Sequence, residues 1–299
     1  MRASRPHVMR KFVIAIVAST VAAAAVTAQS GARSIVAERV MLLTRNSSWT
    51  LVASIPIAFR TFHPQGMVRI GDTLFVSSVE VLDRDAGRGV GHLFKIDPSG
   101  HLISDLRIGE GAIYHPGGID YDGTDIWVPV AEYRPDSRSI VYRVNPGTMR
   151  ATEAFRVADH IGAIVHNVDG HTLHGVSWGS RRFYRWTMSG GGSLSTLNPS
   201  HYLDYQDCKY LVGSRMLCSG VAEFRQTRDA SPFRLGGIDL IDLADDRPLH
   251  QAPVLLWTAG GLDMTHNPVW IEPSEAGLRA YFMPEDDRST LYIYDVNAK

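Results

Sequence analysis

A repeated pattern of short strands constrains the fold more than any other feature of this 299-residue sequence. Each copy opens with a histidine or another polar residue and continues into a short apolar strand that ends at a Gly- or Asp-containing turn. A second apolar strand follows, and then a third in which apolar and polar residues alternate, as in a half-buried strand. The copies begin at residues 63, 115, 160, 205 and 266, and this spacing of roughly 40–60 residues matches a four-stranded propeller blade.

The repeat predicts an all-β protein built as a single β-propeller over residues 49–299. We count five blades; six is the alternative, because residues 35–48 and the long unit 205–265 have room for irregular strands. The chain ends after a third strand, and residues 49–55 supply the missing fourth, so strands from both termini should close the ring. The last strand of the long unit is expected at Pro253–Thr258. No helical period is evident, and residues 29–48 form an N-terminal extension.

Residues 1–28 have the composition of a secretory signal peptide. Four basic residues precede an apolar run from Phe12 to Val26, and Val26 and Ala28 are small residues flanking a cleavage position. The alternative is a membrane anchor, but the run of about 15 residues is shorter than the ~20 that a bilayer requires. We therefore expect cleavage after Ala28 and a secreted or periplasmic protein.

The charge balance of the mature chain excludes some partners. Without residues 1–28, 26 basic and 31 acidic residues remain, for a net charge of −5. A chain with no basic excess is not expected to bind nucleic acid. No segment after the predicted signal is apolar enough to cross a membrane, so no membrane association is expected after cleavage.

The two cysteines of the chain lie symmetrically about a predicted turn. Cys208 and Cys218 flank Gly213, so a hairpin here would place them opposite each other. An export compartment permits a disulfide between them. The alternative is a pair of buried free thiols, because cross-strand disulfides are geometrically demanding.

Several repeat motifs resemble those of known propellers. They are the His-Pro-x-Gly openings at 63–66 and 115–118, the Asp-Gly turn at 122–123 and the Leu-Phe-Lys-Ile-Asp strand at 93–97. These residues look like NHL-repeat blades, an architecture shared by calcium-dependent lactonases of the regucalcin type and by strictosidine synthase-like proteins. The mature chain also resembles a secreted bacterial propeller family without an assigned activity. The resemblance implies a fold, but no segment reproduces the lactonase ligand set.

The repeat places equivalent side chains around one mouth of the central channel. The innermost strand of a blade begins on the face to which the second strand returns, so the repeat openings should lie near the loops after the second strands. The predicted inner ring consists of His63, His115, His160, His266 and, in the fourth unit, Asp207. The carboxylates that begin the neighbouring loops are Glu80, Glu132, Glu223 and Glu285. Imidazoles and carboxylates together suit a divalent cation, whereas the alternative is that each caps a turn in its own blade.

The third unit offers a different set of groups at the same mouth. Trp178 and Arg181 replace the carboxylate there, and with Asp207 they could orient a small polar molecule or a peptide end. The candidate ligand-binding residues are therefore His115, Glu132, Trp178, Arg181, Asp207 and Glu223. The four histidines and four glutamates named above are the candidate ligands of a divalent cation, the only cofactor that the pattern suits.

These residues support three hypotheses about function. The first is an exported propeller that binds a small polar ligand or a divalent cation at the channel mouth. The second is a metal-assisted hydrolase, such as a lactonase, with one glutamate as general base. The third is a protein-interaction platform. The sequence decides neither whether the chain is an enzyme nor its oligomeric state.

Overall fold

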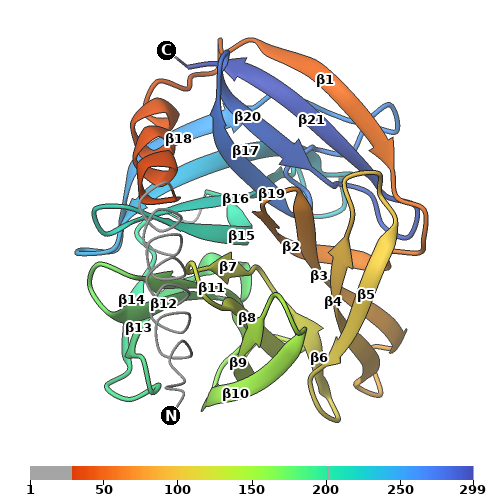
Figure 1. Cartoon of the computed structure of the whole chain (residues 1–299), viewed down its shortest axis with the longest axis vertical. Helices are drawn as coiled ribbons and strands as arrows, with labels where there is room; N and C mark the ends of the chain where they lie inside the picture. The colour runs from red at the N-terminus through yellow and green to blue at the C-terminus, as the bar shows by residue number, and fades with distance from the viewer. Residues whose placement is uncertain (1–28, 201, 299) are drawn as a thin grey trace, which may run out of the picture.

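The computed structural model describes residues 29–200 and 202–298, which form a five-bladed β-propeller (Figure 1). The five antiparallel sheets are arranged around a central axis, and consecutive sheets follow one another along the chain. The prediction of five blades is confirmed, and no sixth sheet is formed by the described residues. The predicted signal peptide, residues 1–28, lies outside them.

The first three blades each pair their strands in chain order from the axis outward. Blade one contains β2 (His63–Ile70), β3 (Thr73–Asp83), β4 (Arg88–Ile96) and β5 (Leu102–Ile108). Blade two contains a broken inner strand, β6 (Ile113–Pro116) and β7 (Asp120–Tyr121), followed by β8 (Ile126–Glu132), β9 (Ser139–Asn145) and β10 (Arg150–Val157). Blade three contains β11 (Ile161–Asn167), β12 (Thr172–Ser177), β13 (Arg182–Thr187) and β14 (Leu194–Leu197), with a short 3₁₀ turn at Trp178–Ser180.

The last two blades complete the ring. Blade four contains β15 (Asp204–Leu211), β16 (Arg215–Phe224), β17 (Phe233–Asp242) and β18 (Arg247–Val254). Blade five contains β19 (Val269–Ser274), β20 (Gly277–Phe282), β21 (Thr290–Asn297) and β1 (Trp49–Pro56). β1 pairs antiparallel with β21, so strands from both ends of the propeller share one sheet, as predicted.

One strand prediction is wrong in position. The outer strand of blade four is β18, which shares only residues 253 and 254 with the predicted strand Pro253–Thr258. An outer strand is only partly buried, so it can carry polar residues, and β18 mixes Arg, His and Gln with apolar residues. The run from Val254 to Trp257, which continues past the end of β18 toward blade five, is more apolar. The strand was therefore predicted too late in the sequence.

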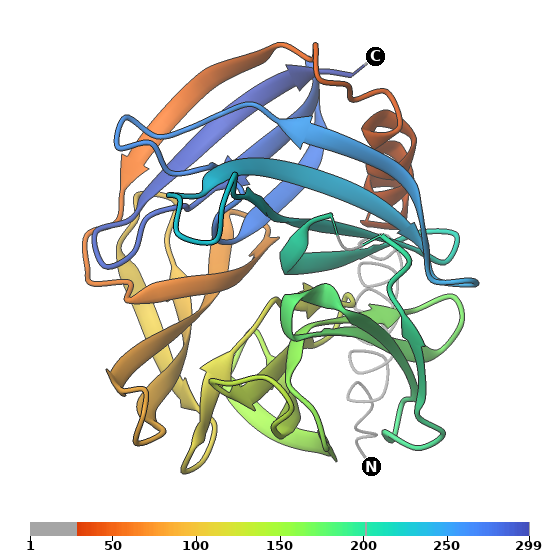
Figure 2. The same ribbon diagram turned by 180° about the vertical axis from the view of Figure 1, so that it is seen from behind.

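A helix over residues 29–40 contradicts the expectation of an all-strand mature chain. Its side chains Val36, Ala37 and Val40, followed by Leu43, are buried in one core cluster with residues of blades four and five. Their spacing is that of one helical face. Figures 1 and 2 show this helix beside the β15–β18 blade. The period was missed because it is short and follows the predicted cleavage position directly.

The propeller has two faces, which we name by the inner strands. The inner strands begin at the opening face and end in hairpin turns at the turn face, and helix 29–40 covers part of the turn face. None of the helices in the described ranges is both long and apolar enough to cross a bilayer.

A buried axial layer separates the two faces. The carboxylate of Asp207 in β15 accepts hydrogen bonds from the backbone N–H of Met67, at 2.9 Å, and of Ile119, at 3.1 Å. The Lys209 ammonium donates to the same carboxylate and to the Ile119 carbonyl. Three blades are thus joined at the axis. Blades two and three also approach each other closely here. A Cβ at residue 117 would lie 2.1 Å from the Gly162 carbonyl oxygen, so this position requires glycine.

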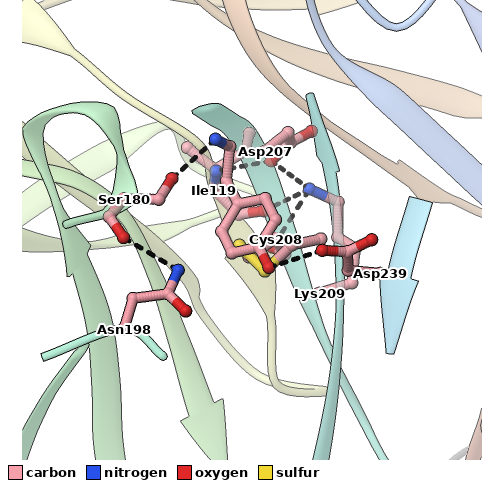
Figure 3. The surroundings of a disulfide bond; sticks show 9 residues. Ile119, Ser180, Asn198, Asp207, Cys208, Lys209 and Asp239 are labelled. Atoms are coloured by element: carbon pink, nitrogen blue, oxygen red, sulfur yellow. Dashed lines mark hydrogen bonds and ion pairs between the residues drawn. A yellow bond between two sulfur atoms is a disulfide. The ribbon is translucent and has the colours of Figure 1, made fainter. Parts of the chain in front are cut away.

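Cys208 and Cys218 form a disulfide between β15 and β16. The two residues are directly opposite each other in the antiparallel register, as the hairpin prediction required. Figure 3 shows the bridge beside Asp207 and Lys209 of the axial layer. The disulfide therefore fastens the strand that carries the axial ion pair, and the free-thiol alternative is excluded.

Candidate functional site

The inner strands and adjoining loops enclose a pocket of about 220 Å³ at the opening face. We call it the opening-face pocket. Three of the predicted histidines line it: His63, His115 and His160. The other lining residues are Gln65, Tyr133, Gly162, Ser177, Trp178, Gly179, Asp204, Tyr205 and Gln206. Blades one to four all contribute, so the pocket exists only once the ring has formed.

His115 is one of two buried histidines in the pocket. Its ring stacks on Tyr133, with a distance of 4.1 Å between ring centroids, and is 5.4 Å from the His160 ring. Its Nδ1 is buried without a hydrogen-bond partner among the described residues. Burial, and to a smaller extent the neighbouring His160, lowers the pKa of His115 well below its usual value. His115 is therefore neutral at physiological pH.

His160 is held in one tautomer. Its Nδ1–H donates to the Glu132 backbone carbonyl, at 2.8 Å, so its Nε2 carries the lone pair and can accept a hydrogen bond. Its ring meets Trp178 edge-on, at 4.7 Å between centroids. Burial lowers the pKa of His160, although the hydrogen bond to Glu132 opposes this. The pocket thus contains two neutral imidazoles.

His63 differs from the other two because it has a carboxylate partner. Its Nδ1 lies 2.8 Å from Oδ1 of Asp286, which also accepts a hydrogen bond from the Asn267 amide. Burial would raise the pKa of Asp286, but His63, Asn267 and His266 together outweigh this and the pKa is lowered. His63 also lines an adjoining pocket of about 310 Å³ that contains Glu80.

Aromatic side chains form one wall of the opening-face pocket. Tyr133 and Trp178 lie 5.9 Å apart between ring centroids. The Arg84 guanidinium, from the β3–β4 turn, lies 4.1 Å from the Tyr133 centroid and 5.9 Å from that of Trp178. Such contacts hold the aromatic wall and place a cation at its edge.

The four predicted glutamates do not form a ring of free ligands. Glu132 is 5% exposed, and its two carboxylate oxygens bind Arg134 and Arg138. Glu223 pairs with two arginines on the surface. Glu285 accepts hydrogen bonds from the Tyr292 hydroxyl and the Thr290 N–H. Only Glu80 lies beside a pocket, the adjoining one, with an oxygen 4.0 Å from His92 Nε2.

Three further candidates have other roles or positions. Asp207 is fully buried in the axial layer and is not among the residues that line the pocket. His266 is half-buried outside the pocket lining. Arg181 is exposed and pairs with Asp204, at 2.8 Å, so it reaches the pocket only through that carboxylate. Of Trp178, Arg181 and Asp207, only Trp178 lines the pocket.

The arrangement gives the predicted cation site no support. Within residues 29–200 and 202–298, no group of three or more His, Cys, Asp or Glu side chains is placed to hold a metal ion. The partners explain why, since arginines, a tyrosine hydroxyl and backbone groups already occupy the carboxylates.

Sequence reasoning missed several pocket residues, among them Gln65, Tyr133 and Gln206, and also Arg84, which lies against the aromatic wall. Tyr133 directly follows Glu132, whose carboxylate is one of the predicted ligands. Gln65 sits inside a His-Pro-x-Gly opening. The loop positions were therefore recognisable, but the pattern favoured titratable residues over aromatic and amide groups.

The sequence matches one family model over residues 21–299. The chain belongs to DUF6454, a family of unknown function. No functionally curated protein matches it. Membership of DUF6454 agrees with the expected likeness to a propeller family without an assigned activity.

Solved structures similar to this DUF6454 chain include three with low sequence identity. A hypothetical protein from Leishmania major is 13% identical, with a TM-score of 0.50, and the match covers 84% of this chain and 92% of that one. The tail fibre of Staphylococcus aureus phage P68 is 10% identical, with a TM-score of 0.47 over 85% of this chain. A nidogen/laminin complex chain is 12% identical, with a TM-score of 0.41 over 63% of this chain. The present chain spans 53% of the tail fibre and 63% of the nidogen/laminin chain.

Proposed function

We propose that this protein is a binding propeller whose opening-face pocket holds a small polar ligand. The observation that carries the proposal is the convergence of two buried neutral histidines, His115 and His160, with the Tyr133–Trp178 wall in one pocket. Ligand sites commonly combine apolar or aromatic walls with a few placed polar groups.

The polar groups of the pocket favour an uncharged, hydrogen-bonding ligand. Nε2 of His160 accepts, whereas the amides of Gln65 and Gln206 both donate and accept. The aromatic wall suits the flat face of a sugar ring or a comparable apolar face. The volume of about 220 Å³ is below the 300–1,000 Å³ typical of drug-sized ligands, so the ligand should be about the size of a monosaccharide or an amino acid.

The alternatives have weaker support. A metal-assisted, lactonase-like hydrolase needs a ligand cluster that the described residues do not form. A protein-interaction platform would use exposed blade edges, and no feature of those edges identifies a partner. A small-ligand site is therefore the function that the pocket supports best.

Export is a second part of the proposal. The basic and apolar character of residues 1–28 supports a cleaved signal peptide, and the Cys208–Cys218 disulfide suits an oxidising compartment. Fractionation of expressing cells and N-terminal sequencing of the purified protein test this part. A mature chain that begins at Gln29 in the periplasm or medium would support it, whereas a reduced cytosolic protein beginning at Met1 would overturn it.

Ligand binding can be tested with a panel of free monosaccharides and amino acids. Ligand-detected NMR would find binders, and calorimetry would measure their affinities. Trp178→Ala should weaken any binder at least tenfold, because it removes half of the aromatic wall. Phe233→Ala is the matched control, since this exposed aromatic does not line the pocket. A panel without binders, or binders insensitive to Trp178→Ala, would contradict the proposal.

A further inference from the structure

A second cavity lies at the turn face, on the other side of the axial layer. Its volume is about 440 Å³, and its described walls come from helix 29–40 and from blades one, two, four and five. We call it the turn-face cavity. Apolar side chains dominate the walls, including Val36, Leu211, Leu217, Trp270 and Ile271. Both the size and the apolar lining are those of small-molecule sites.

A buried carboxylate faces this cavity. Asp120 is 1% exposed and lines the wall, and burial raises its pKa to about 6. One of its oxygens, Oδ2, accepts the His166 backbone N–H at 3.3 Å. None of the described residues donates a hydrogen bond to the other oxygen, Oδ1. Because Asp120 lines the cavity and a carboxylate oxygen can accept further hydrogen bonds, the site favours a ligand that donates one.

A guanidinium from the helix faces the same cavity. Arg33 donates to the Tyr121 carbonyl and lies 5.4 Å from the centroid of the Tyr210 ring. None of the carboxylates in the described residues lies within ion-pair distance of it. The positive charge of Arg33 nevertheless favours the ionised form of Asp120, so it partly offsets the rise in the pKa of Asp120 that burial causes.

The other charged groups at the cavity are already satisfied. Lys209 donates to Asp207 and to the carbonyls of Ile119 and Cys208, which uses all three ammonium hydrogens. Arg69 pairs with Glu272, at 3.0 Å, and with Asp72, at 2.7 Å. Asp120 and Arg33 are therefore the two groups left for a ligand.

We propose that the turn-face cavity binds an apolar molecule that carries one hydroxyl group. The hydroxyl oxygen accepts from Arg33 while its hydrogen is donated to Asp120, and the hydrocarbon body fills the apolar walls. A carboxylate would be repelled by Asp120, and an ammonium would be repelled by Arg33. An uncharged alcohol complements both, and its site is independent of the opening-face pocket.

The test compares three probes with the same chain: 1-decanol, decanoate and decylamine. Calorimetry and the fluorescence of Trp270, which lines the cavity, would report binding to the purified protein. Decanol should bind one to one and at least tenfold more tightly than either charged probe. Equal or tighter binding of decanoate or decylamine would overturn the assigned head group, and no binding of any probe would overturn the site.

Single substitutions test whether decanol binds in the turn-face cavity. Ala32→Trp should fill the cavity from the helix and abolish decanol binding, whereas Ile35→Trp, on the exposed side of the same helix, should not. Asp120→Asn should reduce the preference for decanol over decanoate, because it removes the negative charge that repels decanoate. Unchanged binding in Ala32→Trp would contradict the proposal.

A measurement on the unmodified protein keeps the test decisive if Ala32→Trp does not fold. A diazirine-labelled decanol should crosslink within the cavity walls, at residues 29–36, 69–71, 120–124, 209–217 or 270–273, and crosslinks elsewhere would overturn the assignment. Trp178→Ala should leave decanol binding unchanged, so failure of this proposal is distinguishable from failure of the opening-face proposal.

Discussion

The two faces of the propeller are built by the same inner strands but have different chemistry. At the opening face, the inner strands and the loops around them contribute histidines, amides and aromatic rings to a small polar pocket. At the turn face, the ends of the inner strands contribute mainly apolar groups, and helix 29–40 covers them. The difference shows that a blade repeat fixes positions rather than chemistry.

β15 shows how one strand serves both faces. Asp204 and Tyr205 line the opening-face pocket, Asp207 closes the axis, and Lys209 and Tyr210 line the turn-face cavity. The separation of the two sites therefore depends on a few residues in the middle of this strand.

The largest expected effect comes from breaking this separation. Asp207→Ala leaves the Met67 and Ile119 N–H groups without their acceptor and leaves the buried Lys209 charge unpaired. Loss of one partner of a buried pair should lower the free energy of unfolding by about 3–5 kcal/mol. Urea unfolding followed by circular dichroism would measure it.

A double variant provides the control for this prediction. Asp207→Leu with Lys209→Met removes both charges together, so it should cost less than Asp207→Ala alone. Equal stability of Asp207→Ala and the unmodified protein would show that the Asp207–Lys209 pair does not stabilise the ring.

Loss of the disulfide should have the next largest effect. The Cys208–Cys218 bridge joins residues separated by 10 positions. A disulfide that closes a loop of this length stabilises the folded protein by about 3 kcal/mol. The Cys208→Ala/Cys218→Ala variant should unfold at correspondingly lower urea concentration. The unmodified protein under reducing conditions should show the same shift, and a shift in only one of the two would refute the entropic explanation.

The fold was predictable because a blade repeats its signals five times. Turn glycines, alternating strands and the missing fourth strand each recur or leave a visible gap, so single errors such as the misplaced β18 do not change the result. The helix at 29–40 occurs once, and no other α-helix is formed by the described residues. A feature that occurs once has no such redundancy.

The site was predictable only in its location. The repeat correctly brought His63, His115 and His160 to one pocket. The glutamates are not free ligands because nearby side chains pair with them: Arg134 and Arg225 lie two residues from Glu132 and Glu223, and Tyr292 binds Glu285. Which side chain folds back on which loop is decided by packing, and the strand pattern carries no information on it.

A third prediction concerns Asp239, which connects the opening-face pocket to the interior of blade four. It accepts hydrogen bonds from Tyr205 and Gln251 through one oxygen, and burial raises its pKa to about 6. A carboxyl group with a raised pKa stabilises the fold fully below its unfolded pKa near 4, and this contribution disappears as the pH rises through about 6.

Asp239→Asn removes that pH dependence. At pH 7.5 the variant should be more stable than the unmodified protein by about 2 kcal/mol, because no charge is buried. At pH 4 the two proteins should be nearly equal. Thermal unfolding at both pH values would measure the difference, and a pH-independent difference would count against a buried, titrating Asp239.

The smallest expected effect separates two glutamates that the repeat treats as equivalent. Glu132 is nearly buried between Arg134 and Arg138, whereas Glu223 meets its arginines at the exposed surface. Glu132→Gln should cost up to about 1 kcal/mol, since the arginine side chains are largely exposed, and Glu223→Gln should change stability by less than about 0.5 kcal/mol. Both losses should shrink in 1 M salt, because screening weakens exposed ion pairs. The ion pairs of the Glu132 side chain with Arg134 and Arg138 hold the loop whose backbone carbonyl at residue 132 fixes the His160 tautomer. Glu132→Gln should therefore also weaken ligand binding in the opening-face pocket, whereas Glu223→Gln should not. Equal effects of the two substitutions on stability and on binding would contradict this prediction, because they would show that Glu132 and Glu223 have equivalent roles at the opening face.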